Sequence, residues 1–236
     1  GESNCATLNY ATATSPFGPY TYRGVIIDNW KSNKAVVNNH GSIIEINGQW
    51  YIFYHRPTHG WANMRKACVE PIRFNPDGSI QEVEMTTQGA GGLIDPLLRM
   101  DAARTCEMSG NLMITVRRPE HDIPVEYLSE IKNGDYAYWK YFDFTGSKAD
   151  HFVCKTWGKN ADAMIEIHLD APNGELIGCC ELDAMEGEVA YEIHETSVKP
   201  VTGRHAVVLV FKSREKEESQ QVLMNLEWFM FENRVK

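Results

Sequence analysis

The stretch "NNHGSIIEINGQWYIFYHR", residues 38–56, predicts two antiparallel strands joined by a tight turn. Apolar residues lie on both sides of Asn47-Gly48, and this dipeptide favours a type I′ turn because both of its central residues need a positive φ. Polar residues collect at the far end of the hairpin, with His40 before the first strand and Arg56 closing the second. The hairpin therefore raises the question of whether its polar end lines a site or is only a solvated edge.

Strand-like runs with turn signals between them occur along most of the chain. Short runs rich in Val, Ile, Tyr and Phe end in Gly, Pro, Asn or Asp clusters about every 8–12 residues, which is typical of an all-β fold. The pattern fails from "GAGGLIDP" to "RRPEHDIP". We therefore expect two β-rich domains, residues 1–90 and 125–236, joined by a connector over residues 91–124.

Composition limits the classes of partner. The chain has 236 residues, a net charge of −9 and 43% hydrophobic residues. This length and composition fit a protein that buries a sizeable core. The acidic balance disfavours nucleic acids and anionic membrane surfaces, and the sequence contains no apolar run long enough for membrane insertion. The six cysteines show no C-x-x-C spacing, so the sequence predicts no zinc site.

Three stretches of the first domain carry a resemblance to a known family. They are "YATATSPFGPYTYRGVIID" (10–28), the hairpin above, and "ACVEPIRFNPDGSIQEVEMT" (67–86). Together they resemble the C-terminal part of the catalytic domain of glycoside hydrolase family 43, which includes β-xylosidases and α-L-arabinofuranosidases. The resemblance implies that residues 1–90 form the last one to two blades of a five-bladed β-propeller.

The second domain carries a different resemblance. Four stretches, "NGDYAYWKYFDF" (133–144), "IEIHLDAPNGELIG" (165–178), "VTGRHAVVLVFK" (201–212) and "MNLEWFMF" (224–231), are similar to carbohydrate-binding module family 6. This resemblance implies a jelly-roll β-sandwich over residues 125–236. A hydrolase followed by a module is an arrangement found in family 43. The expected fold class is therefore all-β, with a partial β-propeller followed by a β-sandwich.

The resemblance to family 43 also implies a reaction. The family hydrolyses glycosidic bonds with inversion, which needs one carboxylic acid to protonate the leaving oxygen and one carboxylate to activate water. In family members both carboxylates precede the part matched here, so we expect no catalytic residue in this chain and no hydrolysis by it alone. The complete protein is expected to be a glycoside hydrolase acting on xylan or arabinan side chains or on xylo-oligosaccharides, with no required cofactor.

The polar end of the hairpin acquires a role from the same resemblance. The His of the "NNHGS" motif, here His40, is implied to approach the propeller axis near the catalytic carboxylates. The Arg that closes the "FYHR" strand, here Arg56, is implied to reach toward the substrate, where its planar fork could hold hydroxyl groups or a carboxylate. Asn39 is a weaker candidate for the same site. Without the other blades, His40 has no completed pore to line.

In the second domain, the resemblance implies a sugar-binding cleft lined by loops. Such modules clamp a sugar ring between aromatic side chains, while an Asn or Asp contacts its hydroxyl groups. Asn225 matches the Asn of the final loop. Tyr127 and Tyr191 lie close to the two aromatic positions, which Glu130 and Glu188 occupy here. The other large aromatic residues are expected in the core, namely Trp139, Tyr141, Trp157 and Trp228.

Two acidic residues, Glu107 and Glu227, match positions that often hold a structural calcium ion in such modules. Carboxylates buried without a cation would be costly, and calcium prefers oxygen ligands. The resemblance therefore implies a structural calcium ion at these two residues, although it implies no cofactor for the chemistry.

Three functions remain open. The chain is the C-terminal portion of a larger xylan- or arabinan-debranching enzyme, a non-catalytic carbohydrate-binding protein, or a structural half of a split or oligomeric propeller. The expected partner is an oligo- or polysaccharide, together with the missing blades or a second copy, because an open propeller exposes strand edges and apolar faces. The first residues show no signal-peptide pattern, so a leader is either removed or outside this piece, and we expect a secreted or periplasmic protein.

Overall fold

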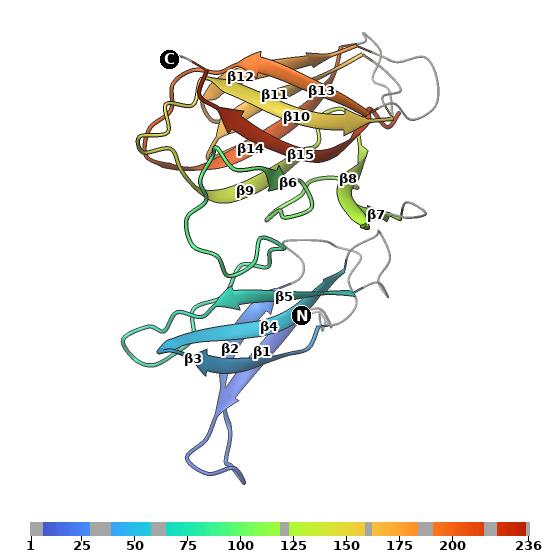
Figure 1. Ribbon diagram of the computed structural model, residues 1–236. Coiled ribbons are helices and arrows are strands. Elements are labelled where there is room, and N and C mark those ends of the chain that lie inside the picture. Colours follow the sequence, from blue (N-terminus) through green and yellow to red (C-terminus); the bar gives the residue numbers. More distant parts are fainter. Residues whose placement is uncertain are drawn as a thin grey trace. The chain divides into compact units, whose positions relative to one another are not determined.

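The computed structural model is shown in Figure 1, and it describes residues 7–28, 39–57, 65–118, 123–158, 162–183, 191–214 and 221–234. All regular elements in these ranges are β-strands, which confirms the predicted all-β fold class. The chain divides into two compact units, Gly1–Ala90 and Gly91–Lys236. Within the described ranges, no helix is long and apolar enough to cross a membrane.

The first unit contains two small antiparallel sheets (Figure 1). One sheet has the strand order β1-β2 and the other has the order β3-β4-β5. A parallel bridge between Ile27 and Val83 connects the segment after β5 to the first sheet. The strands are β1 (Thr7–Thr12), β2 (Thr21–Asp28), β3 (Gly41–Ile46), β4 (Gln49–Pro57) and β5 (Arg65–Pro71).

The opening hairpin consists of β3 and β4, and its turn has the predicted type. Asn47 has a φ of 52° and Gly48 has a φ of 82°, so both central residues adopt the left-handed conformation that a type I′ turn requires. The turn fixes a register in which Gly41 lies opposite Tyr54. A Cβ atom on Gly41 would lie 2.3 Å from the carbonyl oxygen of Phe53, so a larger residue there would push the two strands apart.

Burial is unequal along this hairpin. Ile52 and Tyr54 of β4 lie in the core of the first unit. In contrast, the isoleucines of β3 are 44–49% exposed, namely Ile43, Ile44 and Ile46. Among the described strands, only β4 pairs with β3. The first unit therefore presents an edge strand with apolar side chains to solvent, as an open propeller would.

The second unit is a sandwich of two antiparallel sheets (Figure 1). The larger sheet has the order β13-β10-β15-β8-β7, with β6 paired to β15 as well, and the smaller sheet has the order β12-β11-β14-β9. The strands are β6 (Met100–Asp101), β7 (Met113–Arg117), β8 (Val125–Ile131), β9 (Tyr136–Asp143), β10 (His151–Trp157), β11 (Ala163–Leu169), β12 (Leu176–Leu182), β13 (Tyr191–Ser197), β14 (Arg204–Ser213) and β15 (Met224–Glu232).

Part of the segment expected as a connector, residues 91–124, belongs to the sandwich. β6 pairs with β15 and β7 pairs with β8. Met100 of β6 and Ile114 of β7 are buried in the sandwich core. A strand of two residues shows no alternation, and β7 contributes a single side chain to that core. The pattern of apolar residues therefore gave little sign of either strand.

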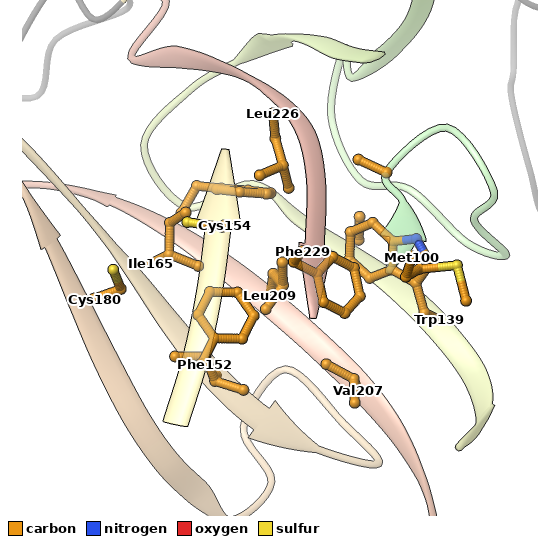
Figure 2. Packing of buried hydrophobic residues seen from close by; sticks show 14 of the residues in the cluster. Met100, Trp139, Phe152, Cys154, Ile165, Cys180, Val207, Leu209, Leu226 and Phe229 are labelled. Carbon is orange, nitrogen blue, oxygen red and sulfur yellow. The ribbon is translucent and has the colours of Figure 1, made fainter. Parts of the chain in front are cut away.

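The sandwich core is rich in aromatic rings (Figure 2). The ring centroid of Phe229 on β15 lies 4.8 Å from that of Trp139 on β9 and 5.7 Å from that of Phe152 on β10. All three side chains are fully buried, which confirms the predicted core position of Trp139. Because aromatic rings bury large apolar areas, this group joins the two sheets.

Tyr141 of β9 does not lie in the core, so its predicted position is wrong. Its side chain is 48% exposed. The register of β9 against β14 shifts between Trp139 and Phe142, and Tyr141 has a positive φ of 73°. This bulge lets Trp139 and Phe142 both face the core although three positions separate them, and it turns Tyr141 outward.

A second bulge lies in β15. Lys155 of β10 is opposite Trp228, and the residue after Lys155 is opposite Leu226. Glu227 is therefore the extra residue of the bulge. Because of it, Leu226 and Phe229 both face the core although they also lie three positions apart.

We expect the exposed isoleucines of β3 to make the chain associate with a second copy at high concentration. Replacing Ile44 and Ile46, which share one face of the strand, by lysine should shift the chain toward monomer because charged edge strands resist pairing. Light scattering over a concentration series measures this shift. Ile193→Lys, at an exposed isoleucine of β13, is the matched control and should change little. A wild-type chain that stays monomeric throughout the series would contradict the expectation.

Candidate functional site

The polar end of the hairpin is partly buried rather than only solvated. β4 ends with His55 and Arg56, which are 6% and 0% exposed. The ring of His40, just before β3, lies 4.5 Å from the ring of His55, measured between centroids. Arg56 Nη1 donates to Thr87 Oγ1 at 3.4 Å. The start of β3 and the end of β4 therefore lie next to each other.

The three residues predicted for this place differ in exposure. His40 is exposed, Asn39 is half-buried and Arg56 is fully buried. In the present arrangement Arg56 therefore lies in the interior of the first unit, away from the solvent through which a substrate would approach. The roles that the resemblance implies for these three residues stay predictions.

A buried hydrogen-bond network lies beside Arg56, and the sequence did not predict it. The Thr86 backbone N–H donates to Tyr54 Oη at 2.8 Å, and Tyr54 Oη donates to the Thr86 carbonyl oxygen at 2.9 Å. The Thr86 hydroxyl donates to Glu70 Oε1. Burial raises the pKa of the Glu70 carboxyl group to about 7. Alternation could have revealed the network, since Glu70 shares the inner face of β5 with buried Cys68.

The contacts of this network indicate a structural role for Glu70 and not a catalytic one. A carboxyl group with a pKa near 7 could donate a proton, but inverting hydrolysis needs a second carboxylate about 6.5–9.5 Å away with substrate between them. Glu70 is only 5% exposed, and one of its oxygens accepts from Thr86. The position of Glu70 indicates that its hydrogen bond holds the segment after β5 against the sheet.

On the sandwich, strand register brings three side chains into one row. Trp157 of β10 lies opposite Tyr191 of β13 on one side and opposite Asn225 of β15 on the other. Residues directly opposite each other on antiparallel strands share a face of the sheet. Cys154 of β10 lies in the core, so Trp157, three positions later, points to the outer face. The row therefore lies on the outside of the larger sheet.

Tyr127 of β8 completes this group. The ring centroid of Trp157 lies 4.8 Å from that of Tyr127 and 6.1 Å from that of Tyr191, with the ring planes inclined at 69° and 49°. Asn225 Nδ2 donates to the Trp157 carbonyl oxygen at 3.4 Å. We call Tyr127, Trp157, Tyr191 and Asn225 the aromatic patch. The structure thus brings together the three residues predicted to bind carbohydrate.

Trp157, at the centre of the patch, is half-buried instead of lying in the core, so its predicted core position is wrong. Trp228 is also half-buried, and the Arg99 guanidinium carbon lies 5.7 Å from the centroid of its ring. The inner face of β10 carries Cys154 and Thr156, both fully buried. Alternation from these two residues would have placed Trp157 outside.

Two cationic side chains lie over the ring of Tyr191. Arg117 Cζ is 4.7 Å and Lys155 Nζ is 4.3 Å from the ring centroid. Lys155 Nζ also lies 3.0 Å from Glu227 Oε1, which makes an ion pair with a nearly buried carboxylate. Burial raises the pKa values of Tyr127 and Tyr191, so both hydroxyl groups stay protonated near neutral pH.

Glu107 and Glu227, the residues predicted to hold calcium, have separate partners. Glu107 Oε1 accepts from the hydroxyl group of Tyr136 at 3.1 Å, whereas Glu227 pairs with Lys155. The ammonium group of Lys155 supplies the positive charge that calcium would otherwise bring. In the part of the chain that the structure describes, no three His, Cys, Asp or Glu side chains are placed to hold a metal ion. This donor set therefore does not fit a shared calcium ion.

Glu130 and Glu188 stand at the two aromatic positions of the resemblance. Glu130 is half-buried in β8 and has a φ of 56°. Glu188 lies outside the described residues. The described part of the patch is built from the neighbouring tyrosines, Tyr127 and Tyr191, together with Trp157.

Comparisons with known proteins give matches for the chain. Residues 101–233 match the family model described as "Carbohydrate binding module (family 6)". A xylosidase/arabinosidase of Thermoclostridium stercorarium is 35% identical over 171 residues, which cover 60% of this chain and 36% of that protein. An arabinoxylan arabinofuranohydrolase of Paenibacillus polymyxa is 27% identical over 213 residues, which cover 86% of this chain and 33% of that protein.

A solved structure is similar over nearly the whole chain. It is a glycoside hydrolase family 43 arabinoxylan arabinofuranohydrolase from Bacillus subtilis in complex with cellotetraose, with a TM-score of 0.59 and 26% identity. The match covers 97% of this chain and 48% of that chain. The chain spans about a third of the length of the curated relatives named above. These matches confirm both predicted resemblances and, with them, the partial propeller and the sandwich.

We expect the stability of the first unit to fall as the pH rises through the pKa of Glu70. That pKa is about 7 in the folded chain, against an ordinary value of 4.5, so the folded state holds the proton more tightly than the unfolded state. The stabilising contribution of the protonated group is fully present below about pH 4.5 and is lost as the pH rises through about 7.

Chemical denaturation of the wild type and of Glu70→Gln, at several pH values between 4 and 8 or so, measures this effect. The substitution should remove most of the decline in the free energy of unfolding, because an amide does not titrate. Glu45→Gln, at an exposed glutamate of β3, should leave the decline in place. Identical pH profiles for the wild type and Glu70→Gln would show that Glu70 is not the group responsible.

Proposed function

Because the chain belongs to carbohydrate-binding module family 6 through residues 101–233, we propose that its second unit binds an oligo- or polysaccharide of plant cell walls at the aromatic patch. The observation that carries the proposal is the row in which Trp157 lies between Tyr191 and Asn225. The C–H faces of sugar rings pack on aromatic side chains, and an amide group contacts hydroxyl groups. Trp157 and Asn225 are both half-buried, so each keeps part of its surface for a ligand.

We further propose that the complete protein is a glycoside hydrolase and that this chain is its C-terminal portion. The support is the likeness of the chain to enzymes named arabinoxylan arabinofuranohydrolase over most of its length. Such an enzyme would hydrolyse xylo-oligosaccharides or arabinose side chains of xylan with inversion. Its acid and base carboxylates would come from blades outside this chain. A secreted or periplasmic location would suit this polymeric substrate.

Within that proposal, the polar end of the hairpin would line the propeller axis once other blades close it. His40 is the exposed member of the pair that it forms with His55, so its ring is available to a neighbouring blade or to substrate. A non-catalytic carbohydrate-binding protein is the second candidate function. The aromatic patch favours it, because all four patch residues belong to the sandwich and need no propeller.

We expect the full chain to bind xylo-oligosaccharides in isothermal titration calorimetry. Trp157→Ala should weaken this binding about tenfold or more, because it removes the central ring on which a sugar would pack. Tyr141→Ala, at an exposed tyrosine on the other sheet of the sandwich, is the matched control and should bind like the wild type. Unchanged binding by a folded Trp157→Ala chain would place the sugar elsewhere.

We also expect the purified chain to leave aryl β-xylosides and aryl α-arabinofuranosides intact at a rate indistinguishable from buffer. The physical reason is that a general acid or base each contributes about 10²–10⁴-fold, and the proposal places both outside this chain. Release of the coloured aryl group measures the rate. Clear turnover that disappears in Glu70→Gln would show that the buried carboxyl group of the first unit is catalytic after all.

A further inference from the structure

Arg117 crosses the outer face of the larger sheet to reach Tyr191. Arg117 ends β7, at one end of the strand order β13-β10-β15-β8-β7, while Tyr191 begins β13 at the other end. Neighbouring strands lie about 4.8 Å apart, so a flat sheet would separate these two strands by roughly 19 Å. The guanidinium carbon nevertheless lies 4.7 Å from the Tyr191 ring centroid. The long side chain of Arg117 therefore extends over the outer face of the sheet and borders the aromatic patch on the β7 side.

The positive charge of Arg117 acts on both tyrosines of the patch. Burial raises the pKa values of Tyr127 and Tyr191, and the charge of Arg117 opposes that rise in each case. The pairing of β7 with β8 explains the position, because Arg117 lies opposite Val125, two residues before Tyr127. Arg117 therefore lies near both Tyr127 and Tyr191, the two rings that flank Trp157.

Charge around the patch is unbalanced. The ammonium group of Lys155 is paired with Glu227 at 3.0 Å, so these two charges offset each other. In the described ranges, the guanidinium group of Arg117 has neither an ion pair nor a hydrogen bond, and it lies over the Tyr191 ring. Among the described residues, one positive charge at the patch therefore has no ion-pair partner, in a chain whose net charge is −9.

The chemistry of a guanidinium group suggests which ligand would use this charge. A guanidinium that lies over an aromatic ring keeps N–H donors at its edge, and these match the two oxygens of a carboxylate. Such charge-assisted hydrogen bonds are roughly twice as strong as neutral ones.

We propose that the aromatic patch selects saccharides that carry a carboxylate, such as a xylan chain substituted with a uronic acid. The proposal rests on the carbohydrate-binding function proposed above and adds the class of ligand. A sugar ring packs on the half-buried face of Trp157, and the carboxylate accepts hydrogen bonds from Arg117. Lys155 stays paired with Glu227. A neutral sugar makes the same aromatic contact but gains no charge-assisted bond.

The test compares two ligands of equal length, a xylo-oligosaccharide with one glucuronic acid substituent and the unsubstituted xylo-oligosaccharide. Isothermal titration calorimetry with the full chain at low salt should give about tenfold tighter binding of the acidic ligand. The ratio of the two affinities should fall as salt is added, because ions screen the charge of Arg117. Arg117→Met should reduce the ratio to about one. Arg99→Met is the matched control, since Arg99 also lies over an aromatic ring of this sheet, and it should keep the ratio.

The outcomes distinguish the selection of carboxylates from carbohydrate binding itself. Equal binding of both ligands by the wild type, or a ratio that survives in a folded Arg117→Met chain, overturns the selection of carboxylates and leaves carbohydrate binding intact. Binding of neither ligand by the wild type overturns carbohydrate binding by the patch itself. Loss of the ratio in Arg99→Met would assign the selection to Trp228 and its surroundings, and would also overturn the role of Arg117.

Discussion

The pairing of β10 on both of its edges is the constraint on which the second unit depends. β13 and β15 hold β10 in register, and a slip by one residue would turn every side chain of β10 to the opposite face. Phe152 and Cys154 fill the core on one face (Figure 2), and the same alternation exposes Trp157 on the other. The packing of the core and the geometry of the aromatic patch are therefore two results of one strand pairing.

The two units differ in how far a hydrophobic core covers their strands. In the sandwich, the aromatic cluster around Phe229 joins the two sheets. In the first unit, a three-stranded sheet has a small core, and part of its interior is a polar network of Tyr54, Glu70 and Thr86. Ile44 and Ile46 remain open to solvent at its edge. This contrast accords with a proposal in which the module is self-sufficient and the blades need neighbours.

The features that the sequence predicted are those that depend on local rules. Asn47-Gly48 specified its turn through backbone conformation alone, and alternation identified most strands. Two of the errors occurred where tertiary pairing overrides a local pattern. A bulge turned Tyr141 outward, and β6, with Met100, is a strand only because β15 offers it a partner. Arg117 could not be assigned to the patch, since no spacing rule relates side chains on the two outermost strands of a sheet.

The bulge at Glu227 has a consequence for chains that differ in length. Between Leu226 and Phe229 of β15, Glu227 is the one residue with no residue opposite it on β10. Leu226 and Phe229 both face the core. If residue 227 were deleted, Leu226 and Phe229 would stand two positions apart, as a regular strand requires for side chains on one face. The parity of the core would survive, whereas the negative partner of Lys155 and the hydrogen bond from the Ala102 N–H to the Glu227 carbonyl oxygen would be lost. A gap at this position in an aligned relative therefore signals the loss of the buried carboxylate that pairs with Lys155 and not a changed fold.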